Sequence, residues 1–236
     1  MKIFDYIIIG AGSAGCVLAN RLTANPKISV LLLEAGGKDI NPWIHIPGGY
    51  FKTMHNPKTD WCFKTQFEKG LGDRQMNYPR GKTLGGSSSI NGLLYIRGQS
   101  QDYDYWRQLG NVGWSWDDVL PYFKKSENNQ RGENNFHGAA GPISVEDMRV
   151  KMKVLDTFIN AASEFGFKHQ SDFNTGDNEG IGYFQVTQKN GFRCSAAVGY
   201  LNPIKKRKNL KIITNAHIKN IEFENKTAKN VNYWVD

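Results

Sequence analysis

Three glycines stand at a spacing that suits the binding of a dinucleotide. Gly10, Gly12 and Gly15 form a G-x-G-x-x-G pattern directly after the apolar run 6–9, which is typical of a buried β-strand. In such a turn the first glycine permits a tight change of direction, and the second lets a pyrophosphate approach the backbone. The third lets the following helix pack closely on the strand. The first turn of that helix offers free N–H groups and a positive dipole end to phosphate oxygens.

An acidic residue follows at the distance that a ribose contact requires. A helix is expected over 13–24 and a second apolar strand over 29–33, and Glu34 ends that strand about twenty residues after the glycines. Its carboxylate can accept hydrogen bonds from ribose hydroxyls, and its charge would repel a 2′-phosphate. The pattern therefore predicts a βαβ unit that binds NAD or FAD, and it disfavours NADP.

A second set of small and polar residues lies in 80–98. Gly85 and Gly86 allow the backbone to approach a ligand closely, and Asn91 with the neighbouring serines supplies uncharged hydrogen-bonding groups. The order of residues excludes a phosphate-binding P-loop, because Lys82 precedes the glycine pair. Without a ligand, the same residues would form a glycine-rich turn followed by a helix.

This second segment resembles the first signature of the glucose–methanol–choline (GMC) oxidoreductases. The match runs from the Gly-Lys-x-Leu-Gly-Gly-Ser-Ser-x-Ile-Asn sequence at 81–91 through Tyr95 and Gly98 to Asp104. The resemblance covers nearly the whole chain and points to the N-terminal portion of such an enzyme. Four further stretches are similar to the choline dehydrogenase and alcohol dehydrogenase branch of the family, namely 102–106, 113–123, 137–142 and 188–197.

The resemblance implies an FAD site and assigns residues to it. The glycine turn would hold the pyrophosphate, Glu34 the adenosine ribose, and the backbone at Ile218 the adenine. Leu84 and the stretch 91–94 would lie along the flavin ring. The full set expected to bind the cofactor is Gly10, Gly12, Ser13, Ala14, Gly15, Glu34, Ala35, Leu84, Gly86, Ser87, Asn91, Gly92, Leu93, Leu94 and Ile218.

The resemblance also implies how the cofactor is held and what it does. Some members attach FAD covalently through a histidine just before the signature asparagine, but this chain has Ile90 there, so a non-covalent flavin is expected. The family oxidises a CH–OH group: hydride passes to the flavin while a late histidine, paired with a second histidine or an asparagine, takes the hydroxyl proton. Catalytic residues are therefore expected beyond Asp236, and His137 is expected to order its loop. The sequence contains five histidines, none in a matching pattern: His45, His55, His137, His169 and His217.

The resemblance thus predicts an FAD-dependent oxidoreductase acting on a small alcohol, choline being one example. This chain would be a fragment, since a second, Ser-Gly-rich signature is absent and the expected strands 210–214, 218–224 and 230–235 would end on a strand without its next neighbour. Two alternatives stay open: a non-catalytic chain that binds FAD, and an NAD-dependent enzyme built on the same βαβ unit. The sequence names neither the electron acceptor nor the oligomeric state.

The expected architecture is an α/β fold, in which a Rossmann-like FAD-binding domain carries inserted α+β segments and is truncated at its C-terminus. Residues 1–37, 78–100 and 205–236 would form its core. The irregular segment 38–77 is rich in aromatics and is a candidate lid over the flavin, unless those rings simply pack on the core. Residues 101–204 would supply insertions and the start of a substrate domain.

Local signals place further elements along the chain. Apolar spacing predicts helices over 102–109 and 153–165, and the Ser-Trp-Asp-Asp sequence at 115–118 is a capping box that predicts the start of another helix. The polar, glycine-rich stretch 128–142 indicates a surface loop, and 183–187 a short strand.

Charge and composition exclude other classes of protein. The net charge of the 236 residues is +8, but the basic run 205–208 contains no aromatic rings, so a solvated turn is favoured over a nucleic-acid site. No apolar run approaches the roughly twenty residues that span a bilayer, and no signal peptide precedes the first strand. A cytoplasmic protein is expected, with peripheral membrane association left open. No metal site is expected, because Cys16, Cys62 and Cys194 lack ligand spacing.

Overall fold

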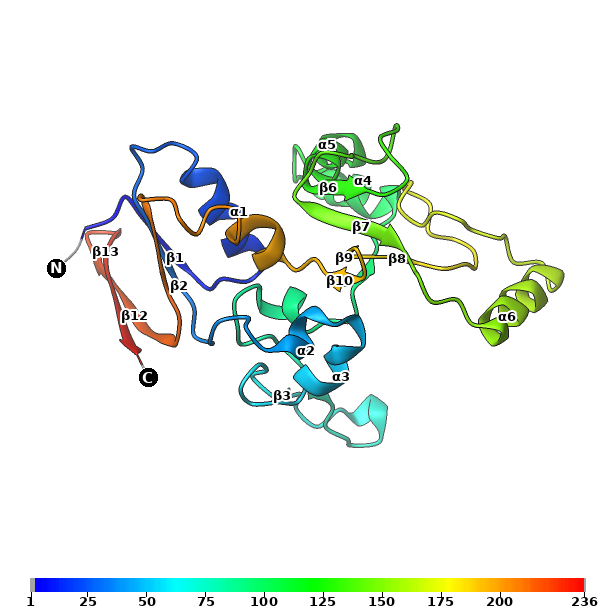
Figure 1. Cartoon of the computed structure of the whole chain (residues 1–236), viewed down its shortest axis with the longest axis horizontal. Helices are drawn as coiled ribbons and strands as arrows, with labels where there is room; N and C mark the ends of the chain where they lie inside the picture. Colours follow the sequence, from blue (N-terminus) through cyan, green and yellow to red (C-terminus); the bar gives the residue numbers. More distant parts are fainter. Residues whose placement is uncertain (1–2, 236) are drawn as a thin grey trace. The chain divides into compact units, whose positions relative to one another are not determined.

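The computed structural model describes residues 3–235 of the chain. It divides into two compact units (Figure 1). The first unit runs up to Gly92 and resumes at Phe192, so it combines the two ends of the chain. The second unit comprises residues 93–191.

The first unit is built on a small parallel sheet. Strand β1 (Tyr6–Ile9) leads into helix α1 (Ser13–Leu22), which is followed by strand β2 (Val30–Leu33). Strand β11 (Leu210–Ile213) pairs with the other side of β2, so that the order is β1–β2–β11 and the strands are parallel. All four side chains of β2 are buried, as expected for the central strand of a parallel sheet. The predicted βαβ unit is confirmed, although α1 ends before Ala24.

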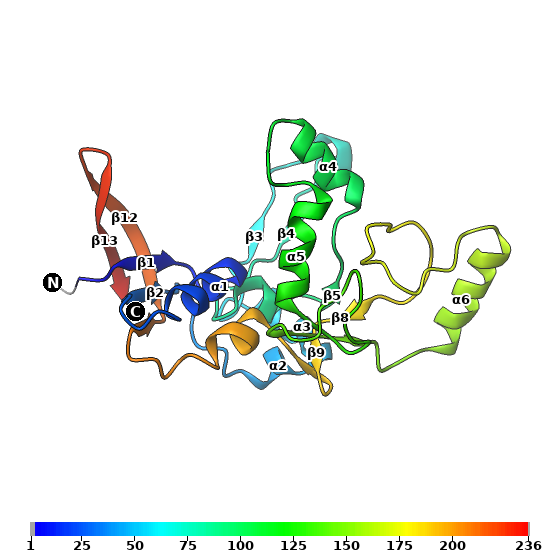
Figure 2. The ribbon, with the colours of Figure 1, turned by 90° about the horizontal axis from the view of Figure 1, so that it is seen from above.

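A two-stranded antiparallel hairpin ends the first unit. Strands β12 (Ala216–Glu224) and β13 (Thr227–Val235) lie side by side (Figure 2). They are joined by Asn225 and Lys226, both of which have positive φ angles. Such angles suit a tight turn between twisted strands. Ala216, at the start of the hairpin, is fully buried against the residues of β2. The three strands expected at the end of the chain are therefore present.

The segment between β2 and the second glycine pair contains only short elements. These short elements agree with the irregular excursion predicted for 38–77. The elements are α2 (Pro42–His45), η1 (Pro47–Gly49), α3 (Tyr50–Thr53), β3 (Phe63–Lys64), η2 (Lys69–Leu71) and β4 (Asn77–Tyr78). Three further short elements complete the first unit, namely η3 (Gly86–Ser89), β10 (Phe192–Arg193) and the π-helical turn η4 (Ala197–Leu201).

The second unit contains a small mixed sheet and three helices. Its sheet has the order β5–β8–β7–β6. The strands are β5 (Leu94–Tyr95), β6 (Glu127–Asn129), β7 (Ile143–Asp147) and β8 (Gln185–Val186). Strand β9 (Gln188–Lys189) follows in the chain and is not part of this sheet. The helices are α4 (Ser100–Gln108), α5 (Trp116–Ser126) and α6 (Lys153–Glu164).

Two sequence predictions in the second unit can be compared directly with this structure. The capping box at the start of α5 is confirmed, because the Ser115 hydroxyl accepts from the backbone N–H of Asp118 while the Asp118 carboxylate accepts from the backbone N–H of Ser115. The prediction of a loop over 128–142 was wrong at its beginning, because residues 128 and 129 belong to β6, which pairs in parallel with β7.

A buried polar cluster holds the second unit together. The Glu127 carboxylate is fully buried and accepts from Arg97 at 2.8 Å, and it also pairs with Nδ1 of His137 at 2.9 Å. The other ring nitrogen of His137 pairs with Asp172 at 2.7 Å. Burial alone lowers the pKa of His137, but the hydrogen bonds with Asp172 and Glu127 outweigh it and raise that pKa to about 9. His137 therefore joins two acidic residues that lie far apart in the sequence.

Candidate functional site

The first glycine corner lies between β1 and α1. Gly10 has a φ of +90°, which glycine adopts without strain, and its N–H donates to the carbonyl of Leu33 at 2.7 Å. Gly12 is the N-cap of α1, and no side chain caps the first turn. The N–H groups of that turn therefore remain available to an anion.

The other two glycines of the motif have different surroundings. A methyl group at Gly15 would overlap the carbonyl oxygen of Gly10, so only glycine allows α1 to lie this close to the turn. A methyl group at Gly12 would instead meet no described protein atom within 4 Å. Gly12 thus faces open space, as a residue that lets a ligand approach the backbone should.

The second glycine corner lies directly against the first. The N–H of Gly85 donates to the carbonyl of Ala11 at 2.7 Å, and both Gly85 and Gly86 have positive φ angles. A methyl group at Gly86 would lie 2.8 Å from Cα of Gly12. The two glycine corners, more than seventy residues apart in the sequence, therefore form one backbone-lined surface.

Glu34 lies at the carboxyl end of β2 and is only 5% exposed. One carboxylate oxygen accepts from the N–H of Ala11 at 2.7 Å and the other from the N–H of Gly36 at 2.8 Å. The pKa of this carboxyl is raised, because the effect of burial exceeds the opposing effects of these two hydrogen bonds and of the charge of Lys82. The carboxylate fixes the glycine turn, and its remaining lone pairs can accept from ligand hydroxyls.

These residues line a cavity of about 640 Å³ in the first unit. That volume lies within the usual range for ligand sites. Eight of the residues expected to bind the cofactor line it: Gly10, Gly12, Ser13, Glu34, Ala35, Gly86, Ser87 and Ile218.

Other expected cofactor residues lie elsewhere. Gly15 is buried behind the turn, Leu84 precedes the glycine pair, and the side chain and carbonyl of Asn91 both accept from Arg193. Ala14 is on the exposed side of α1, and Gly92 ends the first segment of the first unit. Leu93 and Leu94 belong to the second unit.

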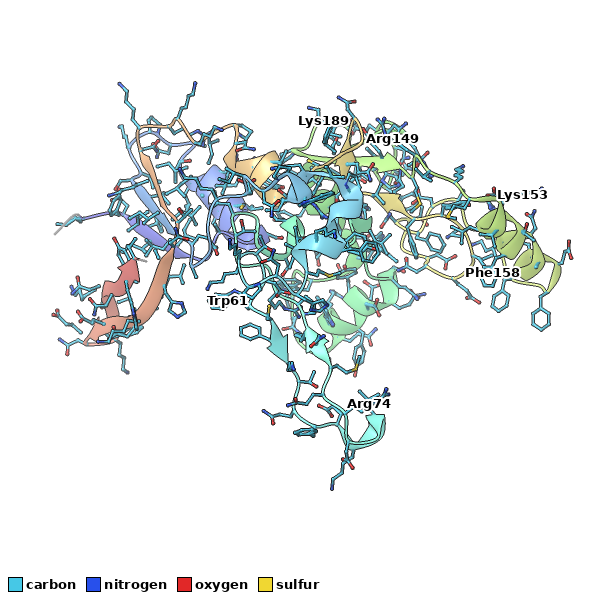
Figure 3. The ribbon with its side chains drawn as sticks, turned by 60° about the horizontal axis from the view of Figure 1, so that its bottom comes forward. Trp61, Arg74, Arg149, Lys153, Phe158 and Lys189 are labelled. Atoms are coloured by element: carbon cyan, nitrogen blue, oxygen red, sulfur yellow. The ribbon has the colours of Figure 1, made fainter. Side chains whose placement is uncertain are left out.

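Eight residues that line the cavity were not among the predicted cofactor contacts, and four of these have aromatic or basic side chains. These four are Trp61, Phe63, Arg80 and His217. Trp61 comes from the segment before β3 (Figure 3), and His217 comes from the start of β12. The concentration of aromatic residues in 38–77 was the available signal, but nothing in the sequence indicated which ring would reach the glycine corners.

A buried arginine stabilises the segment that follows the second glycine corner. Arg193 is 2% exposed, and its guanidinium donates to the carbonyl of Ile44, to the carbonyl of Ser88, and to both the side chain and the carbonyl of Asn91. Burial lowers its pKa to about 10, so it still carries its charge at neutral pH. Arg193 therefore joins α2, η3 and Asn91 into one rigid part of the first unit.

Between residues 3 and 235, no helix combines the length and the apolar character needed to cross a bilayer. Over that range, no three or more His, Cys, Asp or Glu side chains come together as metal ligands would.

Comparison with known proteins gives an independent view of the chain. A family model described as GMC oxidoreductase matches residues 4–233. The alcohol dehydrogenase [acceptor] of Pseudomonas putida is 46% identical over 98% of this chain and 42% of its own length. The oxygen-dependent choline dehydrogenase of Vibrio vulnificus is 43% identical over 98% of this chain and 41% of its own length. The chain thus spans less than half the length of these relatives.

Solved structures with the same fold include an oxidase and an FAD-dependent oxidoreductase. Pyridoxine 4-oxidase from Mesorbium loti superposes with a TM-score of 0.94 and 29% identity, over 99% of this chain and 46% of that one. An FAD-dependent oxidoreductase from Chaetomium thermophilum gives a TM-score of 0.90 and 29% identity, over 99% of this chain and 42% of that one. The expected α/β flavoprotein fold is confirmed by these superpositions.

Proposed function

Because this chain belongs to the GMC oxidoreductase family, we propose that it binds FAD non-covalently in the cavity between its two glycine corners. It forms the N-terminal, FAD-binding part of an enzyme that oxidises the CH–OH group of a small alcohol. The relatives named as alcohol and choline dehydrogenases support this substrate class.

The observation that carries the proposal is the meeting of the two glycine corners. A dinucleotide needs an anion site, a ribose acceptor and a backbone-lined groove between them. The N-terminus of α1, the buried Glu34 carboxylate and the adjoining Gly86 supply these three features around one cavity. The presence of all three features around one cavity supports the binding of a dinucleotide there.

Each residue would act by binding or orienting the cofactor. The free N–H groups of α1 would hold the pyrophosphate, and Glu34 would accept from the adenosine ribose. The backbone at Ile218 would contact the adenine, while Leu84 and 91–94 would lie along the flavin. When bound, FAD supplies the hydride acceptor, and the protein supplies position and electrostatics. Ile90, which is buried and has no nucleophilic atom, supports non-covalent attachment.

The base that takes the alcohol proton would come from elsewhere in the whole enzyme. His137 is engaged by Glu127 and Asp172, and His45 pairs with the carbonyl of Asp39. His217 lies edge-on between two tryptophan rings. These contacts support structural roles for the three histidines, and we propose that this chain alone does not catalyse the reaction.

The test is to purify the chain and titrate it with FAD. We expect a yellow protein with absorbance near ~450 nm, whose flavin is released on acid denaturation. A flavin that stays attached after denaturation would contradict the non-covalent site. A colourless protein that binds NADH instead would contradict the choice of cofactor. Turnover of an alcohol with an artificial electron acceptor by this chain alone would contradict the absence of a base.

A further inference from the structure

A row of aromatic rings crosses one end of the cavity. The Trp61 ring stacks on Phe63, with centroids 5.7 Å apart and planes 7° from parallel, and it meets His217 edge-on at 5.6 Å. His217 in turn meets Trp234 of β13 edge-on at 5.7 Å. Of these rings, Trp61, Phe63 and His217 line the cavity. The row connects the excursion 38–77 with the terminal hairpin of the same unit.

The indole of Trp61 has additional restraints. Its backbone N–H donates to the carbonyl of Arg80 at 2.9 Å, and Nζ of Lys82 lies 4.8 Å from its ring centroid. A cation at that distance stabilises an aromatic ring. Trp61 is therefore held by contacts on several sides, although it belongs to a segment with little regular structure.

Asp60, which precedes this tryptophan, organises the backbone around it. The side chain is 1% exposed, and one carboxylate oxygen accepts from the N–H groups of Cys62 and Arg80, at 3.0 and 2.9 Å. The other oxygen accepts from the N–H of His55 at 2.7 Å. Burial alone raises the pKa of Asp60, but these three donors together lower it, so the carboxylate is charged at neutral pH. His55 and Cys62 both have positive φ angles, a conformation that the hydrogen bonds stabilise.

We infer that Trp61 forms the wall against which the base of an adenine nucleotide packs, and that Asp60 is the residue that positions it. The inference rests on the proposed function. It gives the excursion a role at the adenosine half of FAD, where the cavity also contains Glu34 and Ile218. A purine suits this wall because its flat π-face packs on an aromatic ring without needing a specific hydrogen bond.

The first test measures ADP affinity, because ADP contains the adenosine half of FAD without the flavin. In Trp61→Ala we expect ADP and FAD to bind roughly 5- to 150-fold more weakly, the range found when a base loses an aromatic partner. Trp61→Phe should keep most of the affinity. Trp43→Ala is the matched control, since Trp43 lies in the same excursion, is 47% exposed and is not among the cavity-lining residues.

The second test asks whether Asp60 acts through Trp61. Asp60→Asn keeps the oxygen that faces Cys62 and Arg80 but places an amide donor opposite the N–H of His55. We expect weaker ADP binding in Asp60→Asn, and no further weakening when the same change is made in Trp61→Ala. An additive loss in the double variant would show that Asp60 has only a general structural role, and would overturn that part of the inference.

A measurement on the unaltered protein covers the case in which a variant does not fold. Oxidative footprinting of the indoles should show ADP protecting Trp61 but not Trp43. If the wild-type chain binds neither FAD nor ADP, the proposed function fails. If it binds both, while Trp61→Ala binds them equally well or Trp61 is unprotected, the proposed function stands and the inference about Trp61 is refuted.

Discussion

Replacing Gly12 by alanine should separate cofactor binding from folding. Gly12 has φ −74° and ψ −165°, a conformation open to alanine, and the added methyl would meet no described protein atom within 4 Å. Loss of a glycine stabilises a protein by about 0.4–1 kcal/mol through the unfolded chain. Alanine is a poorer N-cap than glycine by a comparable amount, so the two effects nearly cancel. We therefore expect the stability of the ligand-free protein to change by less than about 1 kcal/mol.

The same methyl group would occupy the space through which a pyrophosphate approaches α1. Losing one hydrogen bond between a backbone N–H and a charged phosphate oxygen costs about 1.5–3 kcal/mol. That cost corresponds to roughly 10- to 150-fold weaker binding of FAD. The assay is an equilibrium titration that follows flavin fluorescence, combined with thermal unfolding of the ligand-free protein.

Gly15→Ala is the contrasting variant, because it should lower the stability of the ligand-free protein. Its methyl group would overlap the carbonyl oxygen of Gly10, and such overpacking costs about 1–3 kcal/mol. In a chain of this size the midpoint of thermal unfolding should fall by roughly 2–12 °C. If Gly12→Ala binds FAD within twofold of the wild type, the pyrophosphate does not lie at this turn, and the reasoning is wrong.

Three further perturbations test the packing around the site and in the second unit. Arg193→Met should destabilise the protein by about 3 kcal/mol in denaturant titrations, because it removes the guanidinium that donates to the buried carbonyl of Ile44 and to the partly buried carbonyls of Ser88 and Asn91; unchanged stability would mean that water replaces the guanidinium. The pKa of His137 is raised from 6.5 to about 9, so its stabilising effect is complete below pH 6.5 and is lost as the pH rises through 9. Unfolding free energy should therefore fall by about 3 kcal/mol over that range in the wild type but not in His137→Gln, and equal slopes would contradict the charged histidine. Ser115→Ala should cost about 1 kcal/mol by removing the cap of α5, whereas Ser115→Thr, which keeps the hydroxyl, should retain most of the stability.

The parts of the fold that depend on neighbouring residues could be predicted from the sequence. The glycine turn, α1 and β2 follow from apolar periodicity and turn chemistry within about thirty residues. The cap of α5 depends on two side chains three residues apart. The family resemblance added the convergence of the second glycine pair on the first, which local patterns alone do not predict.

The parts that depend on distant residues could not be predicted in this way. Trp61 reaches the cavity because Asp60 gathers three backbone donors, one of which lies twenty residues away. Glu127, His137 and Asp172 form one buried cluster although no spacing rule connects them. The role of Arg193 was equally hidden, since a single arginine in a polar stretch is usually exposed. Long-range burial of polar groups leaves little trace in a single sequence.

The position of β2 in the sheet has a consequence for synthesis of the chain on the ribosome. One edge of β2 pairs with β1 soon after both are made, but the other edge pairs with β11, about 180 residues later. At the usual elongation rates of about 5–20 residues per second, that partner appears roughly 10–35 s afterwards. During this interval four consecutive apolar residues, Val30–Leu33, present an unpaired strand edge in the nascent polypeptide. Recombinant expression should therefore respond to chaperone supply and growth temperature, because this edge can pair with other nascent chains.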